Sequence, residues 1–209
     1  MKKILSIDFD CIMSPCIKLY NDKCHGDANP TEFWNHLNNQ MDIDKFLCYD
    51  ANILESIALL MKRNVDNGTR FIPIEEHQQI VDHLKAIEES KIDLVNIDFH
   101  HDIWYNRESI NTIDMFGEYS CADWVGYLYQ KNMLNSYTWV KMPNSEPYNA
   151  SVIAKMDKDF QMNVLRSRDI LDLPSDFDEI YFCKSPQWVP YKYIHLYDLL
   201  VKIIGGECS

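Results

Sequence analysis

The sequence predicts a three-layer α/β/α fold built around a mainly parallel sheet. Short, continuously apolar runs alternate along the chain with longer segments in which apolar residues recur at helical spacing. Runs of this kind are typical of strands that are buried on both faces, and such strands occur mainly in parallel sheets covered by helices. The 209 residues are 46% hydrophobic, which is enough for one substantial core. We therefore expect a single domain that spans residues 1–209.

The alternation assigns each element to a segment of the chain. Five apolar runs are expected to form strands: Ile4–Phe9, Phe71–Ile74, Leu94–Phe99, Tyr137–Met142 and Ile180–Cys183. Four segments of helical period are expected to form helices: Ile53–Met61, Ile80–Ile87, Trp124–Tyr129 and Tyr191–Ile204. The stretch from Met142 to Asp169 has weak periodicity, and we expect a loop there with at most one short element.

Composition and net charge limit the kinds of molecule that the protein is expected to bind. The net charge is −12, from 32 acidic and 20 basic residues, which argues against nucleic acid or an anionic membrane as a partner. An acidic chain is compatible with cationic ligands such as metal ions or guanidinium groups. No apolar stretch reaches the length of a membrane span, and the first apolar run is too short for a signal peptide. The seven cysteines are scattered and form no CxxC pair, which predicts a reduced, cytoplasmic protein.

Acidic and histidine residues gather directly behind two of the apolar runs. Asp8 and Asp10 follow the first run, and Asp98, His100 and Asp102 follow a later one. Residues at positions i, i+2 and i+4 of an extended chain point to the same side, so each set is expected to converge. In parallel sheets, ligands collect beyond the carboxyl ends of the strands, which is where these residues lie.

His77 is a sixth candidate, because it follows the run RFIPIEEH and precedes a predicted helix. If the three strand ends are neighbours, four carboxylates and two imidazoles face one small volume. Ionised carboxylates that crowd together away from water are strongly destabilised unless a cation compensates them. Oxygen ligands with a minority of imidazole favour Mn²⁺ or a similar metal over a thiolate-bound zinc site. The alternative is that each carboxylate caps a turn or a helix.

The motifs resemble those of the ureohydrolases, the arginase and agmatinase group. The stretch from Asp98 to Asp102, DFHHD, is similar to their DAHxD motif, and LSIDFDCIMSP is similar to their SFDxDxxDP motif. His77 is similar to the histidine of their GGxH motif. The aspartate-rich motif comes last in those enzymes and first here, so the chain resembles a circularly permuted and shortened relative. The nearest resemblance is to the peptide arginases, which convert arginine side chains of ribosomally made peptides to ornithine.

This resemblance implies an arginase-like fold and a site with two Mn²⁺ ions per chain. The ligands that it implies are Asp8, Asp10, His77, Asp98, His100 and Asp102. Asp8 and Asp98 would bridge the two ions. His77 and Asp102 would complete the shell of one ion, and the remaining two ligands that of the other. A hydroxide shared by the ions would attack the guanidinium carbon to give an amine and urea, and Asp102 would relay its proton.

Five further residues are candidates for catalysis or substrate binding. His101 alternates out of the ligand set and is either a catalytic proton-transfer residue or a structural histidine. Glu75 and Glu76 either hold the guanidinium by a bidentate contact, with Glu76 also a candidate catalytic residue, or form an acidic helix start. Ser185 and Trp188, within FCKSPQWVP, either line the substrate site or form a proline-stiffened turn with the tryptophan in the core.

The chain departs from the ureohydrolase motifs at three points. Glu75 and Glu76 replace the glycines before the family's histidine, and Met13-Ser14 stand where the third aspartate of DxDxxDP is expected. No segment matches the loops that hold the α-amino and α-carboxylate groups of free arginine. The last departure favours arginine within a chain, so the expected partner is an arginine-containing precursor peptide.

Two other functions stay open at this point. ILSIDFDCI also resembles the hhhDxDx motif of haloacid-dehalogenase-type phosphatases, in which Asp8 would be the nucleophile and Asp10 the acid/base beside Mg²⁺. That interpretation leaves DFHHD unexplained, and Ile12 stands where threonine or valine is usual. The other alternative is a catalytically degenerate relative that binds a peptide. A metal-dependent amide deacetylase, a related hydrolase, needs fewer carboxylates than the chain offers.

Overall fold

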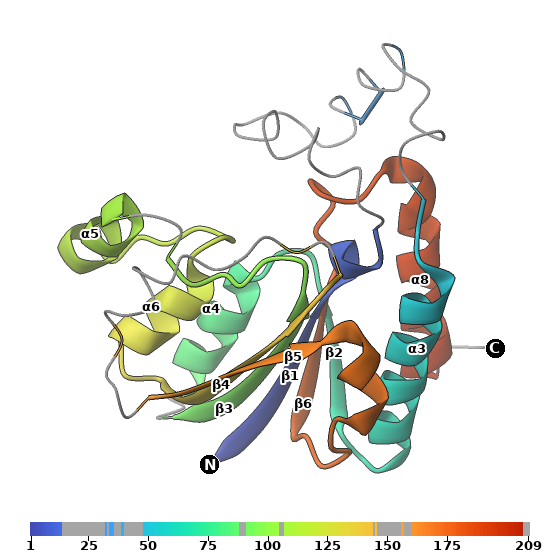
Figure 1. Ribbon diagram of the computed structural model, residues 1–209, viewed down its shortest axis with the longest axis horizontal. Helices are drawn as coiled ribbons and strands as arrows, with labels where there is room; N and C mark the ends of the chain where they lie inside the picture. The colour runs from blue at the N-terminus through green and yellow to red at the C-terminus, as the bar shows by residue number, and fades with distance from the viewer. Residues whose placement is uncertain are drawn as a thin grey trace.

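A six-stranded parallel sheet in the order β2-β6-β1-β3-β4-β5 forms the centre of the protein. The structure is a computed structural model that describes residues 1–13, 32, 34–35, 39, 48–87, 91–104, 107–143, 145, 156 and 160–206. Helices lie on both faces of the sheet (Figure 1). The predicted three-layer α/β/α fold with a parallel sheet is therefore confirmed.

The elements follow the predicted alternation closely. The strands are β1 (Lys2–Asp8), β2 (Arg70–Ile74), β3 (Ile92–Asp98), β4 (Leu134–Lys141), β5 (Gln161–Arg166) and β6 (Glu179–Cys183). The helices are α3 (Ala51–Asp66), α4 (Gln78–Ala86), α5 (Arg107–Phe116), α6 (Trp124–Gln130) and α8 (Tyr191–Gly205), with the 3₁₀ helices η1 (Phe9–Ile12) and η4 (Ser167–Asp172). Within the described residues, every helix is too short or too polar to traverse a lipid bilayer.

Among the described strands and α-helices, β5 and α5 were not identified from the sequence. β5 is an edge strand that pairs only with β4, and most of its side chains are exposed or half-buried. It therefore lacks the continuous apolar run that marks a strand buried on both faces. Within the described part of the stretch from Met142 to Asp169, the regular elements are β5 and the first residues of η4.

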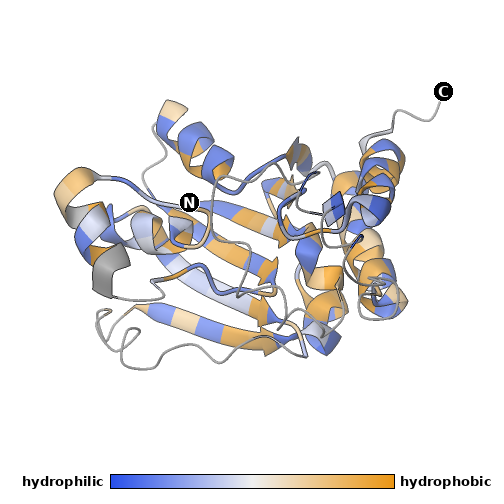
Figure 2. Ribbon diagram, turned by 90° about the horizontal axis from the view of Figure 1, so that it is seen from above, coloured by the Kyte–Doolittle hydropathy of each residue, from blue (hydrophilic) through white to orange (hydrophobic). Residues whose placement is uncertain are grey.

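The side chains of the central strands divide between two hydrophobic cores. Leu5 and Ile7 of β1 face the core formed with α3 and α8, whereas Ile4 faces the core formed with α4 and α6. The alternation follows from the two-residue period of a strand, and it requires helices on both faces. The helices on each side carry both hydrophobic and hydrophilic residues, as expected of helices with one buried side (Figure 2).

The last residues of the six strands form one row across the carboxyl edge of the sheet. In strand order the row is Ile74, Cys183, Asp8, Asp98, Lys141 and Arg166. The row is thus neutral at one end, acidic in the middle and basic at the other end. β1 is followed by α3 on one face and β3 by α5 and α6 on the other (Figure 1), and the carboxyl ends of two such neighbouring strands are the usual ligand position in parallel sheets.

Candidate metal centre

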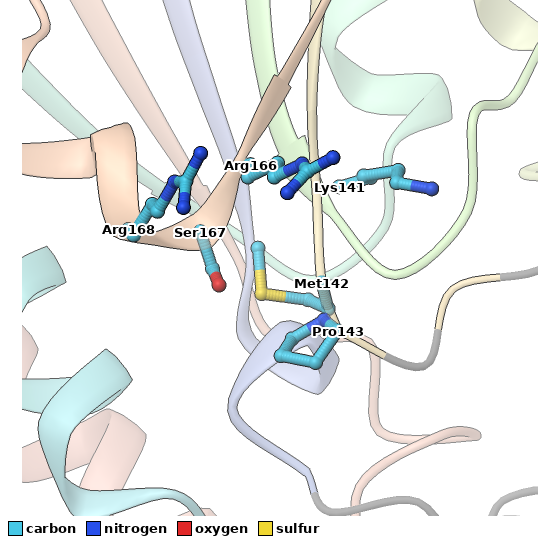
Figure 3. A pocket seen from close by; sticks show the side chains of 6 residues that line it. All are labelled: Lys141, Met142, Pro143, Arg166, Ser167 and Arg168. Atoms are coloured by element: carbon cyan, nitrogen blue, oxygen red, sulfur yellow. The ribbon is translucent and has the colours of Figure 1, made fainter.

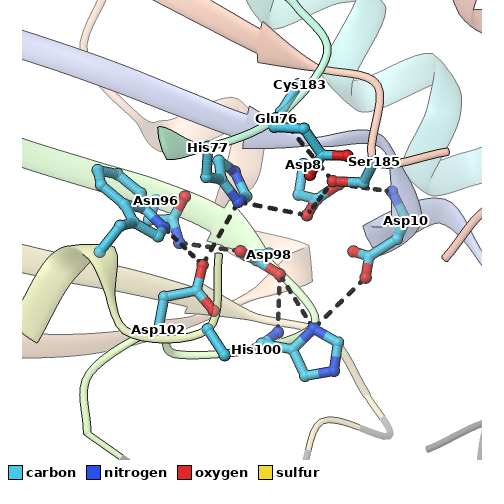
Figure 4. A network of polar contacts seen from close by, with 12 residues as sticks. Asp8, Asp10, Glu76, His77, Asn96, Asp98, His100, Asp102, Cys183 and Ser185 are labelled. Atoms are coloured by element: carbon cyan, nitrogen blue, oxygen red, sulfur yellow. Dashed lines mark hydrogen bonds and ion pairs between the residues drawn. The ribbon is translucent and has the colours of Figure 1, made fainter. Parts of the chain in front are cut away.

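All six ligands predicted from the sequence meet at the carboxyl ends of β1 and β3 (Figure 4). Within the described residues, three groups of side chains have ligand atoms that all lie within 4.8 Å of one another. The groups are Asp8, His77 and Cys183; Asp10, Asp98 and His100; and His77, Asp98 and Asp102. The second and third groups share Asp98, and the first and third share His77. The three groups therefore form one continuous cluster.

Turns, rather than strand alternation, bring most of these ligands together. Only Asp8 and Asp98 belong to strands, so the expectation that each set converges along an extended chain is wrong. Oδ1 of Asp8 accepts a hydrogen bond from the Asp10 backbone N–H at 3.1 Å, and Oδ1 of Asp98 accepts one from the His100 N–H at 2.7 Å. An aspartate that binds the backbone two residues ahead folds the chain back. The same turn therefore ends both central strands.

Asp102 is held in place by the start of α6. Its φ of 50° is in the left-handed region, which aspartate tolerates better than most residues. Its carbonyl accepts hydrogen bonds from the N–H groups of Val125 and Gly126. Its carboxylate Oδ2 accepts a hydrogen bond from Trp124 Nε1 at 2.7 Å, and the Trp124 ring stacks on His77 with centroids 5.1 Å apart. One tryptophan thus positions two candidate ligands.

We expect Trp124→Phe to lower metal affinity or activity about tenfold to a hundredfold, the usual effect of losing a group that orients a ligand. Phenylalanine keeps a ring against His77 but removes the hydrogen bond to Asp102. Metal titration at fixed pH measures the change. Trp104→Phe is the matched control, because Trp104 Nε1 donates to Gln130 and not to a candidate ligand. Equal metal affinity in the two variants would contradict this role of Trp124.

The loop that follows β6 holds Asp8. Ser185 is buried, with a φ of 45°, and its Oγ donates a hydrogen bond to Asp8 Oδ2 at 2.8 Å. Its backbone N–H donates to the Glu75 carbonyl at 3.1 Å, which ties this loop to the turn that precedes α4. A non-glycine residue with positive φ costs free energy and persists only where its surroundings enforce it. Ser185, predicted as a substrate-lining residue, therefore lies beneath the cluster and orients one of its carboxylates.

The distances between ligand atoms fit a cation better than direct hydrogen bonds. His77 Nδ1 lies 3.6 Å from Oδ2 of both Asp8 and Asp102, and His100 Nδ1 lies 3.4 Å from Asp10 Oδ2 and 3.8 Å from Asp98 Oδ1. Hydrogen bonds between nitrogen and oxygen are normally about 2.7–3.2 Å long. Ligands about 2.1 Å from a shared divalent ion stand roughly 3–4 Å from each other.

The electrostatics of the cluster also call for positive charge. No lysine or arginine among the described residues forms an ion pair with its carboxylates. Burial, reinforced by neighbouring carboxylates, raises the pKa of Asp8 and of Asp98 well above the usual range, and burial raises the pKa of Asp102 to about 6. Burial lowers the pKa of His77 to about 3, so this imidazole is neutral and free to act as a ligand. Uncompensated, these carboxyl groups must retain protons.

Two polar atoms of the cluster are buried without a hydrogen-bond partner in the described structure. They are Asp10 Oδ1 and His77 Nε2. A buried polar atom without a partner costs about 1–3 kcal/mol, so each of these two residues keeps one polar atom that the described residues leave unsatisfied. The donor set of four carboxylates and two imidazoles fits Mn²⁺ or a similar divalent ion. The residues present therefore fit a metal centre.

Cys183 is the one soft ligand atom in the cluster. Its buried thiol lies within reach of Asp8 and His77. Its Sγ lies 3.3 Å from Ser185 Oγ. Burial raises the pKa of this thiol well above its usual range, as it does for the neighbouring Asp8 carboxyl group. The centre is therefore dominated by oxygen and imidazole.

His101 lies outside the three ligand groups. Its Nδ1 accepts a hydrogen bond from the Ile103 N–H at 3.1 Å, and its ring packs edge-on against Trp139. The Tyr137 hydroxyl donates to its carbonyl at 2.8 Å. Burial lowers the pKa of His101 to about 4, which keeps the ring neutral. These contacts anchor the chain between two ligands.

The acidic pair before α4 has one exposed and one half-buried member. The Glu75 carboxylate lies 3.4 Å from Lys184 Nζ at the surface. Glu76 is half-buried beside the cluster, where Gln187 Nε2 donates to its Oε1 at 3.4 Å and burial raises its pKa. Trp188 is half-buried, and its ring centroid is 5.3 Å from that of His100. Glu76 and Trp188 therefore border the cluster, and Glu75 is paired elsewhere.

Trp124, Asn96 and Cys183 were not among the predicted site residues. Asn96 Nδ2 donates to Asp98 Oδ2 at 3.1 Å. A period-two pattern identifies Asn96, because a buried polar residue two positions before a ligand faces the same side of its strand. Trp124 is remote in sequence from the residues that it touches, and its spacing indicated only a helix core.

The chain matches no protein-family model, no curated protein and no solved structure. The geometry and chemistry of the cluster are therefore the basis for its function. A largely buried group of carboxylates and imidazoles at the carboxyl ends of parallel strands, without an ion pair to lysine or arginine among the described residues, is suited to bind divalent ions. Ions held there can activate water beside a half-buried carboxylate.

Proposed function

We propose that the protein is an arginase-like metal-dependent hydrolase. It would hydrolyse the guanidino group of arginine side chains in a ribosomally made precursor peptide, giving ornithine and urea with two Mn²⁺ ions per chain as cofactors. The observation that carries this proposal is the pair of ligand groups that share Asp98. One group contains Asp10 and His100, and the other contains His77 and Asp102, the division that the ureohydrolase resemblance implies.

The chain's own residues would hold the ions and orient the reactants. The expected ligands are Asp8, Asp10, His77, Asp98, His100 and Asp102. When bound, two such ions make hydroxide available at neutral pH by lowering the pKa of water. The Asp102 carboxylate, oriented by the Trp124 N–H, would accept the proton that the attacking water loses and pass it to the departing nitrogen.

Glu76 is the best placed residue to hold the guanidinium group. It is half-buried beside the cluster, and a carboxylate binds a guanidinium through two parallel hydrogen bonds. Glu75 is the weaker candidate, since its carboxylate already lies beside Lys184 at the surface. The Trp188 ring, adjacent to His100, would cover one side of the bound group and limit the access of bulk water.

The cluster supports the hydrolase over a phosphatase that uses Asp8 as its nucleophile. Both oxygens of Asp8 accept hydrogen bonds, one from the Asp10 N–H and one from Ser185 Oγ, and the side chain is buried. A nucleophilic carboxylate must expose an oxygen to the phosphorus atom. That mechanism also has no use for His77 or Asp98, which lie in the same cluster.

A product assay tests the proposed function. Full-length protein reconstituted with Mn²⁺ is incubated with arginine-containing peptides, with free arginine and with p-nitrophenyl phosphate. We expect one urea for each arginine converted to ornithine, detected by mass spectrometry of the peptide, and no phosphate release. Phosphate release without urea would replace the proposal with the phosphatase. Metal binding without either product would indicate a degenerate peptide-binding relative.

A further inference from the structure

A cavity of about 340 Å³ opens at the carboxyl ends of β4 and β5 (Figure 3). Its lining residues are Lys141, Met142, Pro143, Arg166, Ser167 and Arg168. Three of the six are basic and none is acidic. We call this cavity the basic pocket. In a chain with a net charge of −12, such a local excess of positive charge is suited to bind an anionic group.

The pocket's basic side chains are only partly neutralised by the protein. Within the described residues, neither Lys141 nor Arg166 forms an ion pair with a carboxylate, and Arg168 Nε lies 3.7 Å from Asp169 Oδ1. Lys141 and Arg166 are neighbours in register, so their side chains leave the sheet on the same face and point the same way in Figure 3. The two cations can therefore contact one anion.

The position of the pocket relates it to the metal centre. Lys141 pairs in register with Asp98, and Arg166 pairs with Lys141. Neighbouring strands lie about 5 Å apart, so the backbones of these two basic residues lie roughly 5 Å and 10 Å from the backbone of Asp98 along the row. Alternate side chains of an extended peptide are about 7 Å apart and point to the same side. A peptide that crosses the strand ends can thus occupy both places.

We propose that the basic pocket binds a carboxylate of the peptide substrate while an arginine two residues away enters the metal centre. This inference rests on the proposed function and adds a substrate preference to it. A carboxylate matches the planar guanidinium of Arg166, which binds it through two parallel hydrogen bonds. The carboxylate belongs either to an acidic side chain or to the end of a peptide that terminates near the arginine.

Paired peptides test this preference. The first pair is acetyl-Glu-Ala-Arg-Ala-Glu-amide and its analogue with both glutamates replaced by glutamine, which covers both directions of binding. The second pair ends in arginine-alanine, with a free carboxylate or an amide. In at least one of the two pairs, we expect the KM of the peptide with the carboxylate to be about fivefold to tenfold lower than that of its uncharged analogue. The kcat should be the same within the pair, because the contact is remote from the reacting carbon. The difference should shrink as salt rises.

Two variants test whether the preference for carboxylate-bearing peptides arises in the basic pocket. Arg166→Gln should remove the difference within a pair, and Lys91→Gln should preserve it, because Lys91 is an exposed cation that precedes the amino end of β3. A preference in the first pair identifies an acidic side chain as the source, and one in the second pair identifies a terminal carboxylate. Equal KM values within both pairs, or a preference that survives in Arg166→Gln, would overturn the proposal.

Calorimetry with the same peptides separates the two proposals. If urea forms but affinities within each pair are equal, hydrolysis stands and the basic pocket does not bind a carboxylate. If no urea forms but the carboxylate-bearing peptides bind more tightly to the parent than to Arg166→Gln, the pocket stands and the proposed hydrolysis fails.

Discussion

Asp98→Asn is expected to abolish retention of Mn²⁺ and to lower urea formation by more than about a hundredfold. Asp98 is common to two ligand groups, so its loss removes a ligand from both. Residues that merely orient a ligand are worth about tenfold to a hundredfold, and a shared ligand should be worth more. Asparagine preserves the size of the side chain and removes its negative charge. Bound metal after gel filtration and urea release from an arginine-containing peptide measure the two effects.

Asp93→Asn provides the matched control for this substitution. Asp93 lies near the amino end of the same strand, where it accepts hydrogen bonds from Asn135 and Ser136. The variant loses the same charge from β3 at the opposite edge of the sheet and should retain both metal and activity. Full activity in Asp98→Asn, or equal loss in both variants, would show that the shared carboxylate is not a metal ligand.

The second large effect is a fall in the stability of the metal-free protein as pH rises from the usual pKa range of a free aspartate toward the raised pKa values of the buried carboxyl groups. The raised pKa values of Asp8 and Asp98 mean that the folded state holds protons that the unfolded state has lost. The free energy of unfolding should therefore drop by up to about 1.4 kcal/mol per pH unit for each of these groups. Urea denaturation at pH 6.5 and 7.5, in the presence of a chelator, measures the slope.

The histidines oppose this trend only in more acidic solution. Burial lowers the pKa of His77 to about 3 and that of His101 to about 4, so both favour folding as pH rises toward the unfolded value of about 6.5. Above that value they are neutral in both states, and the carboxyl groups alone set the slope. Saturating Mn²⁺ should remove the slope, and Asp98→Asn should reduce it. A metal-free protein whose stability is the same at both pH values would contradict the buried charge cluster.

The sequence was most informative where local pattern and chemistry coincide. The apolar runs that precede Asp8 and Asp98 identified two central strands and placed both carboxylates at their carboxyl ends, because a buried parallel strand is visible in a continuous apolar stretch. Asp10 and His100 were placed in the cluster for the wrong geometric reason. A backbone turn at each strand end, rather than an extended chain, brings them in.

The pairing of strands that are distant in sequence and the packing of helices on the sheet could not be predicted from local sequence patterns. The strand order brings Lys141 next to Asp98 and Arg166 next to Lys141, and neither pairing is indicated by a sequence motif. The contact of Trp124 with Asp102 and His77 likewise depends on how α6 docks against the sheet. β5 was missed because edge strands carry exposed polar residues. The acidic core of the site was therefore predictable, whereas its supporting and basic parts required the fold.

The number of metal ions per chain tests the central claim most directly. Protein is loaded with Mn²⁺, freed of excess ion by gel filtration and analysed by mass spectrometry of the metal. About two ions are expected for the parent and about one for Asp10→Asn, since Asp10 belongs to only one ligand group. A folded parent that retains no metal, or an Asp10→Asn variant that retains as much as the parent, would contradict a binuclear centre at the ends of β1 and β3.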